Sequence, residues 1–291
     1  NVVSNPKFLM GAIYRVSPEK FMEFLKEDGS LFMENLRNAK ATDTYIASGD
    51  NDLKVWETEF LYHGFRYIEV EGLDFLSKAD IKAVAIYTDI DNNSFFKSGS
   101  PMLNAIHNIA LQTERANIHS IFTDCPQRDE RMGWLNDATV RFEETPYNFE
   151  IGRMYPKVLR DIADSQTKDG AISDTVPFIY GTRPADPVCS SFLVLAKKAY
   201  EFTGNKEVIE QFFNSLYKWE ECLSKNSENY IVNYSNYGDW ASPAYACVKG
   251  SLGDGAMSLK VPGSFMSTGY YYYNAVLLSQ FAEILEREED R

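Results

Sequence analysis

The densest group of side chains that could do chemistry lies in TDCPQRDERMGWLND, residues 123–137. Pro126 and Gly133 prevent an uninterrupted helix, so a constrained loop is predicted for this segment. The charged and aromatic side chains of the loop are Asp124, Arg128, Asp129, Glu130, Arg131, Trp134 and Asp137. Charges and a tryptophan gathered on a constrained loop indicate a functional site.

Carboxylates would have to carry out proton transfer in this loop. The three histidines, His63, His107 and His119, are isolated in the sequence and predict neither a nucleophile pair nor a metal set. Hydrolysis of a glycosidic bond fits the residues present: one carboxyl group protonates the leaving oxygen, another carboxylate activates water, and an indole packs against the sugar. We assign the acid to Glu130, because the aspartates around it would favour its protonated form.

A structural explanation of the same loop competes with the catalytic one. Asp124 and Asn136 would then cap helices, and the arginines would pair with carboxylates on a solvated surface. Structural ion pairs outnumber catalytic ones, which favours this explanation for an ordinary charged loop. The density of charge and the nearby tryptophan favour a site here.

A second aromatic and acidic cluster is YSNYGDWASPAYA, residues 234–246. Its Tyr237, Asp239 and Trp240 lie on a loop with Gly and Pro, where exposed aromatic rings indicate a ligand such as a sugar. Ordinary loop packing with Trp240 half-buried is the alternative. The run of tyrosines at 270–273 lies in a helical pattern and covers every face of one turn, so some must contact core and others a polar partner.

Two kinds of apolar pattern divide the chain. Up to about residue 96 the pattern is short and alternating, which predicts a β-sandwich domain over residues 1–97. Strands are expected at 43–47, 54–56, 65–70 and 81–87, with an amphipathic helix at 18–26. Residues 98–291 change to the helical period. Helices are expected at 101–117, 137–144, 149–166, 188–202, 206–223 and 267–287, and their long loops suggest an array of hairpins or a toroid.

Composition excludes several classes of protein. The chain has 291 residues, of which 44% are hydrophobic and 14% aromatic, so it is not disordered or low-complexity. Its formal net charge of -13 disfavours nucleic acid or a membrane surface as a partner. No apolar run is long enough to span a bilayer, which favours a soluble protein, cytoplasmic or exported.

Cofactors are not indicated by the sequence. The four cysteines show no CxxC spacing. No metal-ligand set is visible, although a structural Ca²⁺ on the Asp-rich loops stays open. We therefore expect no cofactor.

The segment DCPQRDERMGWLND, residues 124–137, resembles the signature of the bacterial α-L-rhamnosidases. These are inverting glycoside hydrolases built on a six-hairpin (α/α) toroid flanked by β-sandwich domains. Four further segments resemble family landmarks in family order: 34–45 (ENLRNAKATDTY), 60–72 (FLYHGFRYIEVEG), 237–240 (YGDW) and 267–275 (STGYYYYNA). The resemblance implies a multidomain α and β chain, with a β-sandwich followed by an (α/α)6 toroid catalytic domain.

The resemblance also implies roles and a substrate. Glu130 matches the general acid. The matching sugar-site positions are Asp124, Arg128, Trp134, Asp137, Asp186, Asp239 and Trp240. The implied substrate is a rhamnose-containing glycan or glycoside, whose terminal α-L-rhamnosyl group is removed with inversion.

The chain departs from the family pattern in three places. Asn136 stands where the family has Gly, and Asn tolerates a left-handed backbone nearly as well. Residues 182–186 (TRPAD) replace a Trp-containing Gly-Asp motif, and only Asp186 looks equivalent, which leaves the sugar specificity open. The family's general base would lie beyond Arg291, and about six of twelve toroid helices are predicted, so we expect only the first half of the toroid.

Two alternative functions remain at this point. The chain could be a truncated, non-catalytic carbohydrate-binding fragment, which would self-associate through the apolar faces of an open half-toroid. It could also be an (α/α)-toroid glycosidase or lyase of different sugar specificity, since a fold does not fix a reaction.

Overall fold

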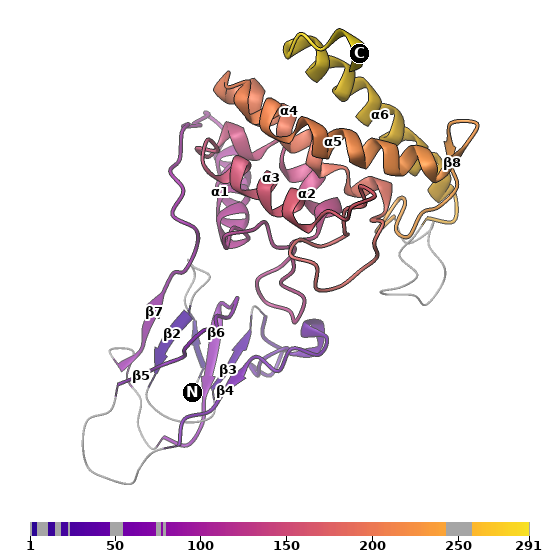
Figure 1. Ribbon diagram of the computed structural model, residues 1–291. Helices are drawn as coiled ribbons and strands as arrows, with labels where there is room; N and C mark the ends of the chain where they lie inside the picture. The colour runs from indigo at the N-terminus through magenta and orange to yellow at the C-terminus, as the bar shows by residue number, and fades with distance from the viewer. Residues whose placement is uncertain are drawn as a thin grey trace. The chain divides into compact units, whose positions relative to one another are not determined.

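The computed structural model divides into two compact units, which are described separately (Figure 1). The first unit combines residues Asn1–Asp89 with Lys97–Arg131, and the second combines Ile90–Phe96 with Met132–Arg291. The residues that the structure describes are 2–4, 11–14, 19–22, 24–46, 55–73, 77, 80–242 and 258–290.

Two small antiparallel sheets form the strand portion of the first unit. The strands are β1 (Val2–Ser4), β2 (Gly11–Tyr14), β3 (Glu19–Met22), β4 (Thr42–Asp43), β5 (Trp56–Glu57), β6 (Tyr67–Val70) and β7 (Lys82–Val84). One sheet has the order β1-β6-β3-β4 and the other the order β5-β2-β7. The central strands therefore pair with neighbours that are distant in the sequence, as in a sandwich.

The predicted helix at residues 18–26 is wrong. Its residues Glu19–Met22 form strand β3, which pairs with β6 on one side and β4 on the other. Backbone partners on both sides outweigh a local amphipathic pattern, because strand formation depends on tertiary context. Strands are confirmed within 65–70 and 81–87, whereas β4 and β5 overlap the predicted segments only at Asp43 and Trp56.

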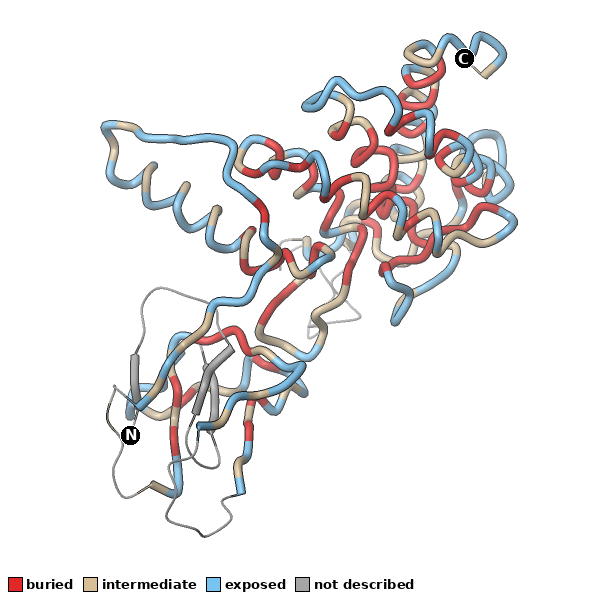
Figure 2. Tube along the Cα trace, turned by 60° about the vertical axis from the view of Figure 1, so that its left-hand side comes forward, coloured by how far each residue is buried: buried red, intermediate tan, exposed pale blue. Residues whose placement is uncertain are grey.

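The core of the first unit gathers around β6. Ile68 and Val70 are buried, while the alternate side chains are less so, which gives the period of two expected for a strand with one buried face. The short 3-10 helix η1 (Glu34–Leu36) contributes Leu36, which is 1% exposed. The remaining buried members of this core are Leu31, Ala41 and Phe65. Figure 2 shows these buried segments in red.

Helix α1 (Pro101–Ala116) belongs to the first unit and confirms the helix predicted at 101–117. Pro101 lies at its first position, and the Ser100 hydroxyl accepts a hydrogen bond from the Leu103 amide, as at a helix N-cap. Several apolar side chains of α1 are exposed: Met102, Leu103, Ile106 and Ile109.

The second unit is helical. Its helices are α2 (Leu135–Arg141), α3 (Met154–Ser165), α4 (Ser191–Thr203), α5 (Glu207–Lys225) and α6 (Gly263–Ile284), with 3-10 turns η3 (Thr145–Tyr147), η4 (Pro187–Cys189) and η6 (Glu288–Asp290) and a hairpin of β8 (Ser227–Glu228) and β9 (Ile231–Val232). All five helices predicted after residue 130 are present. The helix expected from 149 begins only at Met154, because Phe149 instead forms a bridge with Asn92.

Helix α4 lies at the centre of this unit and packs against α2, α3, α5 and α6. Residues Phe192 to Ala196 are all buried, as a helix surrounded by others requires. The adjacent α5 buries Phe213 and Trp219 on one face. Truncating a fully buried aromatic residue such as Trp219 to Ala typically costs about 3–5 kcal/mol.

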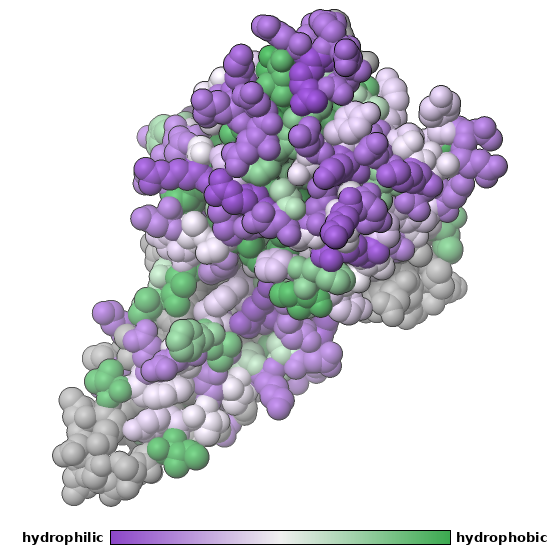
Figure 3. Space-filling view, in the orientation of Figure 1, coloured by the Kyte–Doolittle hydropathy of each residue, from purple (hydrophilic) through white to green (hydrophobic). Residues whose placement is uncertain are grey.

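The face of the helical unit seen in Figure 3 is largely hydrophilic. On α5, exposed charged side chains such as Glu207, Glu210 and Lys218 alternate with buried apolar ones. In the part of the chain that the structure describes, every helix falls short of the length or apolar character needed to cross a bilayer.

Candidate active site

The loop predicted to hold the acid follows α1 in the first unit. Its start is fixed on the end of that helix, where the Thr123 amide donates to the Asn117 carbonyl at 2.9 Å. Arg131 at its other end has a left-handed backbone, with φ of 51°. The left-handed conformation considered for Asn136 is wrong, because that residue lies inside α2, where a regular helix fixes its backbone.

Glu130 lies between two arginines. Its Oε2 accepts a hydrogen bond from Arg37 Nη1 at 2.7 Å and lies 3.1 Å from Arg128 Nη2. The same Arg128 nitrogen lies 3.5 Å from Asp124 Oδ2. Among the described residues, none donates a hydrogen bond to Glu130 Oε1. One carboxylate oxygen is thus held while the other stays available to a ligand.

The structural explanation of this loop predicted arginine–carboxylate pairs on a solvated surface. Such pairs do form here, but their side chains are only partly exposed to solvent. The Glu130 side chain is 24% exposed, and that of Asp124 is 5% exposed. Charge-assisted contacts of this kind orient a carboxyl group more firmly than an exposed surface pair does. The arrangement therefore holds the Glu130 carboxyl group in a fixed direction.

Asp124, Cys125 and Glu130 also form a group of potential metal ligands, with ligand atoms within 4.8 Å of one another. Burial is the main cause that raises the pKa of Cys125, which keeps its thiol protonated near neutral pH. Arg128 contacts both carboxylates and supplies the positive charge that a cation would otherwise provide. The donor set fits an ion-pair network better than a metal centre.

Arg131 fastens the loop to the strand portion of the same unit. It donates from Nη1 to the Tyr62 carbonyl at 2.6 Å and from Nε to the Arg128 carbonyl at 2.8 Å. Its guanidinium carbon lies 4.9 Å from the Tyr62 ring centre, and that ring stacks on His119 at 4.4 Å. Burial lowers the pKa of His119, so this histidine is neutral at pH 7 and serves packing rather than proton transfer.

A cluster of aromatic rings forms in the second unit. Trp134 is 8% exposed and meets Tyr237 edge-on at 5.6 Å and Tyr180 at 6.0 Å. Trp240 meets the other side of Tyr237 at 5.5 Å. Tyr180 and Trp240 are 61% and 39% exposed, respectively. The buried Nε1 of Trp134 has no hydrogen-bond partner among the described residues, so the cluster offers apolar walls and one donor.

Asp186 organises the loop that carries this cluster. It is fully buried, and its Oδ2 accepts hydrogen bonds from the Tyr237 amide at 2.7 Å, the Ser235 hydroxyl at 3.0 Å and the Asn236 amide. Its Oδ1 accepts from the Val188 amide at 2.9 Å. This enclosure differs from the direct sugar contact expected for Asp186, because its carboxylate oxygens are already occupied by protein donors.

Asp174 is a second buried carboxylate, which the sequence reasoning missed. It accepts hydrogen bonds from the Asp186 amide at 2.8 Å, the Thr182 hydroxyl at 2.8 Å and the Tyr237 hydroxyl at 3.3 Å. Burial first, and the Asp174 charge second, raise the pKa of Tyr237, so its hydroxyl stays protonated. The segment before the predicted 182–186 motif carried no signal beyond one Asp between Ser173 and Thr175.

Asp239 lies in a polar pocket of about 310 Å³ in the second unit. Tyr237, Ser235, Ser258 and Ser264 are among the other residues that line it. The size and the hydroxyl lining suit a small polar ligand such as a sugar. Asp137 is not among the residues that line this pocket; it is exposed on the first turn of α2.

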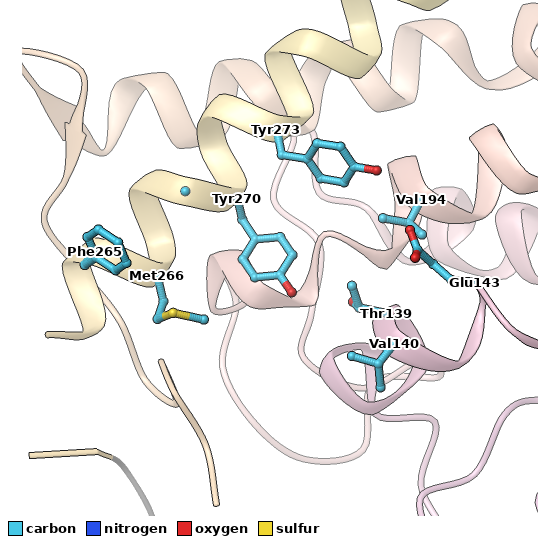
Figure 4. Close-up of a pocket in the computed structure, with 9 residues that line it drawn as sticks. Thr139, Val140, Glu143, Val194, Phe265, Met266, Tyr270 and Tyr273 are labelled. Atoms are coloured by element: carbon cyan, nitrogen blue, oxygen red, sulfur yellow. The ribbon is translucent and has the colours of Figure 1, made fainter. Parts of the chain in front are cut away.

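A larger apolar groove of about 450 Å³ lies between α2, α4 and α6 (Figure 4). Tyr270 and Tyr273 point from α6 into this groove, toward Thr139 and Val194. The Tyr273 hydroxyl lies 3.4 Å from Lys197 Nζ, while Tyr272 is 72% exposed. The tyrosine run therefore divides between packing, a polar partner and solvent, as predicted.

The predicted site residues fall into two groups. Asp124, Arg128 and Glu130 come together in the first unit, and the remaining members, Trp134, Asp137, Asp186, Asp239 and Trp240, belong to the second. Three neighbours were missed: Arg37, Asp174 and Tyr180. Arg37 lies inside the landmark 34–45, which was a usable signal, whereas Tyr180 followed only from the loop's path in three dimensions.

Two family models match the chain. Residues 19–87 match the bacterial alpha-L-rhamnosidase concanavalin-like domain, and residues 91–291 match the bacterial alpha-L-rhamnosidase 6 hairpin glycosidase domain. The fold thus combines a concanavalin-like sandwich domain with a six-hairpin glycosidase domain. The chain belongs to the bacterial alpha-L-rhamnosidase family.

Curated relatives and solved structures agree with this family. An alpha-L-rhamnosidase of Formosa agariphila is 30% identical over 94% of this chain, and one of Streptomyces avermitilis is 31% identical over 91%. The chain covers 29% and 25% of these two proteins.

Two structures superpose on nearly the whole chain. The alpha-L-rhamnosidase from Dictyoglumus thermophilum has a TM-score of 0.83 and 33% identity, over 99% of this chain and 31% of that one. The Streptomyces avermitilis alpha-L-rhamnosidase complexed with L-rhamnose has a TM-score of 0.83 and 28% identity, over 97% of this chain and 27% of that one.

Proposed function

We propose that this protein is an α-L-rhamnosidase that removes terminal α-L-rhamnosyl groups by hydrolysis with inversion. The observation that carries the proposal is Glu130, whose Oε2 is held by two arginines while Oε1 has no hydrogen bond to the described residues. A general acid needs this combination of a fixed carboxyl group and a free oxygen within reach of the leaving group.

The roles follow from these surroundings. Glu130 donates its proton from Oε1 to the glycosidic oxygen, and the carboxylate that remains is stabilised by Arg37 and Arg128. Water attacks the anomeric carbon from the opposite face and loses a proton to the general base as the bond to the leaving oxygen breaks. The family resemblance assigns sugar contacts to Asp124 and Arg128 in the first unit and to Trp134, Asp137, Asp239 and Trp240 in the second, and we propose that Asp186 positions the loop of Trp240.

The general base stays a prediction from the family resemblance. It was expected beyond Arg291, together with the second half of the toroid. The chain spans about a quarter to a third of the length of the relatives it matches. We also propose the domain boundaries expected from the sequence, a sandwich at 1–97 and the helical catalytic domain at 98–291.

The test compares Glu130→Gln with the unchanged full-length protein on two α-L-rhamnosides. An alkyl rhamnoside has a poor leaving group and needs the acid, so its kcat/KM is expected to fall roughly 10²- to 10⁴-fold. A dinitrophenyl rhamnoside has a leaving group that departs without protonation and should change little. Early NMR spectra of the product should show the β anomer. Equal losses on both substrates, or an α product, would contradict the proposal.

A second candidate is carbohydrate binding without turnover. The exposed ring of Tyr180 beside the nearly buried Trp134, and that of Trp240 beside Tyr237, favour it, because such aromatic walls bind a sugar face in many proteins. Titration calorimetry with L-rhamnose and with glucose, beside the hydrolysis assay, separates the candidates. Binding of L-rhamnose with no hydrolysis of either rhamnoside supports the second one.

A further inference from the structure

We infer that Arg37 is the positioning residue of the general acid: it fixes Oε2 of Glu130 so that Oε1 faces the leaving group. The inference rests on the proposed function of Glu130. Its geometry is direct, because Arg37 Nη1 donates to Glu130 Oε2 at 2.7 Å across 93 positions of sequence. The contact joins a residue of the range 19–87, which matches the concanavalin-like domain, to one of the range 91–291, which matches the glycosidase domain.

The backbone of Arg37 is fixed by the core of the first unit. The residue before it, Leu36, is 1% exposed, and Ala41 shortly after it is 8% exposed; both belong to the same apolar cluster. The Ala39 amide donates to the Leu36 carbonyl at 3.1 Å, which closes the turn between them. The backbone of Arg37 is thus held by a well-packed core, and this limits the positions that its guanidinium can take beside Glu130.

The conformation of Arg37 is itself unusual. Its φ of 57° and ψ of -114° lie in a region that L residues other than Gly avoid. Strained backbone of this kind persists where the surrounding structure determines it, and it is concentrated at functional sites. Glycine would adopt the conformation more readily, so the arginine side chain has a purpose that offsets the strain.

Arg128 does not replace this contact. It lies on the same loop as Glu130, two residues away, and it also contacts Asp124. An arginine that moves with the loop neutralises charge without fixing the loop's orientation. Arg37 comes from outside the loop and so connects the Glu130 side chain itself to the core of the unit. Both arginines contact Oε2, which leaves Oε1 as the oxygen that carries the transferable proton.

The test measures kcat/KM of the Arg37→Met variant of the full-length protein on two α-L-rhamnosides that differ in their leaving group. We expect kcat/KM for an alkyl α-L-rhamnoside to fall roughly 10- to 100-fold, mainly in kcat, because misplacing an acid removes part of its contribution. The value for a dinitrophenyl rhamnoside should change by less than about 3-fold, since that leaving group needs no proton. Arg37→Lys keeps the charge and should restore part of the lost activity.

Two further variants separate positioning from stability. Arg66→Met replaces an exposed arginine of the same unit, whose guanidinium carbon lies 5.7 Å from the centre of the Tyr67 ring. It should leave kcat/KM for both rhamnosides unchanged. Arg37→Gly relieves the backbone strain, so it should melt at the same or a higher temperature than the unchanged protein and still show the loss on the alkyl substrate. This variant keeps the test valid if Arg37→Met folds poorly.

The outcomes distinguish this inference from the proposed function. If Glu130→Gln shows the leaving-group dependence and well-folded Arg37→Gly does not, the inference is overturned and Glu130 stays the acid. If Arg37→Met loses activity equally on both substrates, Arg37 has a general structural or binding role, which also overturns it. If neither rhamnoside is hydrolysed by the unchanged protein, the proposed function itself fails.

Discussion

Glu130 of the first unit and the two aspartates Asp174 and Asp186 of the second unit have opposite surroundings. In the first unit Glu130 is partly exposed and is held by the guanidinium groups of Arg37 and Arg128. In the second unit Asp174 and Asp186 are fully buried and accept hydrogen bonds from amides and hydroxyls of the surrounding loops. The first arrangement leaves an oxygen free for a ligand, whereas the second occupies its oxygens with protein donors.

This difference indicates two roles for acidic side chains in this protein: fixing the shape of a loop and offering a carboxylate oxygen to a ligand. A buried carboxylate with several backbone donors fixes loop shape, because removing it leaves those donors unsatisfied. A partly exposed carboxylate with charged neighbours contributes little to folding and is available for chemistry. The comparison predicts that mutating the enclosed carboxylates should affect stability most, and that mutating Glu130 should affect activity.

The largest expected effect on stability is that of Asp186→Ala. It leaves the amides of Asn236 and Tyr237 without their acceptor in a buried place. We expect the free energy of unfolding to fall by about 3–5 kcal/mol, measured by urea denaturation. Glu210→Ala, at an exposed position on α5, is the matched control and should change it by less than about 0.5 kcal/mol. A similar change in both variants would remove the distinction between the units.

Gly181→Ala should have the next largest effect. Gly181 has φ of 95°, and a Cβ there would lie 2.7 Å from both Cβ and Oδ2 of Asp174. We expect a loss of about 2–3 kcal/mol, because backbone strain adds to a steric clash with a fixed carboxylate. In Gly204→Ala the φ is also positive, at 67°, but nothing lies within 4 Å. Its smaller loss, about 1 kcal/mol, measures the strain alone; equal losses would exclude the clash.

Glu220→Gln tests a partly buried carboxyl group of α5 by its pH dependence. Burial raises the pKa of Glu220 from 4.5 to about 8. The stabilising contribution of its protonated form is fully present below pH 4.5 and is lost as the pH rises to about 8, since the unfolded chain releases the proton first. The full shift would correspond to about 5 kcal/mol, and solvent at this partly buried side chain reduces it. The variant should therefore gain about 2 kcal/mol over the unchanged protein at pH 8.5 and nothing at pH 4.

Urea denaturation at both pH values gives this difference. Glu221→Gln changes the exposed neighbour of Glu220 and serves as the control, with no expected gain at either pH. A gain for Glu220→Gln that is the same at pH 4 and pH 8.5 would show that ionisation is not its cause.

Glu130→Gln should have the smallest effect on stability, in spite of its large predicted effect on catalysis. The Arg37 and Arg128 side chains are 51% and 26% exposed, so water replaces part of the lost contact. We expect the free energy of unfolding to change by less than about 1 kcal/mol. A loss as large as that of Asp186→Ala would mean that Glu130 is a structural carboxylate and would break the contrast between the two units.

Much of this organisation could be predicted from local pattern. The six helices predicted after residue 98 are present, because apolar residues at helical spacing and the Ser-Pro start of α1 are signals within one segment. Residues 18–26 misled the same reasoning, since the strand there depends on partners far along the chain. The resemblance of residues 124–137 identified the family because several residue types recur there at fixed spacing.

What the sequence by itself determined is the set of chemical groups: the acid candidate Glu130, the aromatic residues Trp134 and Trp240, the acidic excess and the family. Only the tertiary structure decided which carboxylates are enclosed and which arginine reaches the acid. Asp186 and Glu130 look alike in a sequence. In the structure, Asp186 is buried among backbone donors and fixes the shape of its loop, whereas Glu130 is partly exposed beside two guanidinium groups and is open to a ligand. These surroundings come from residues far apart in the chain, such as Arg37, which local spacing cannot reveal.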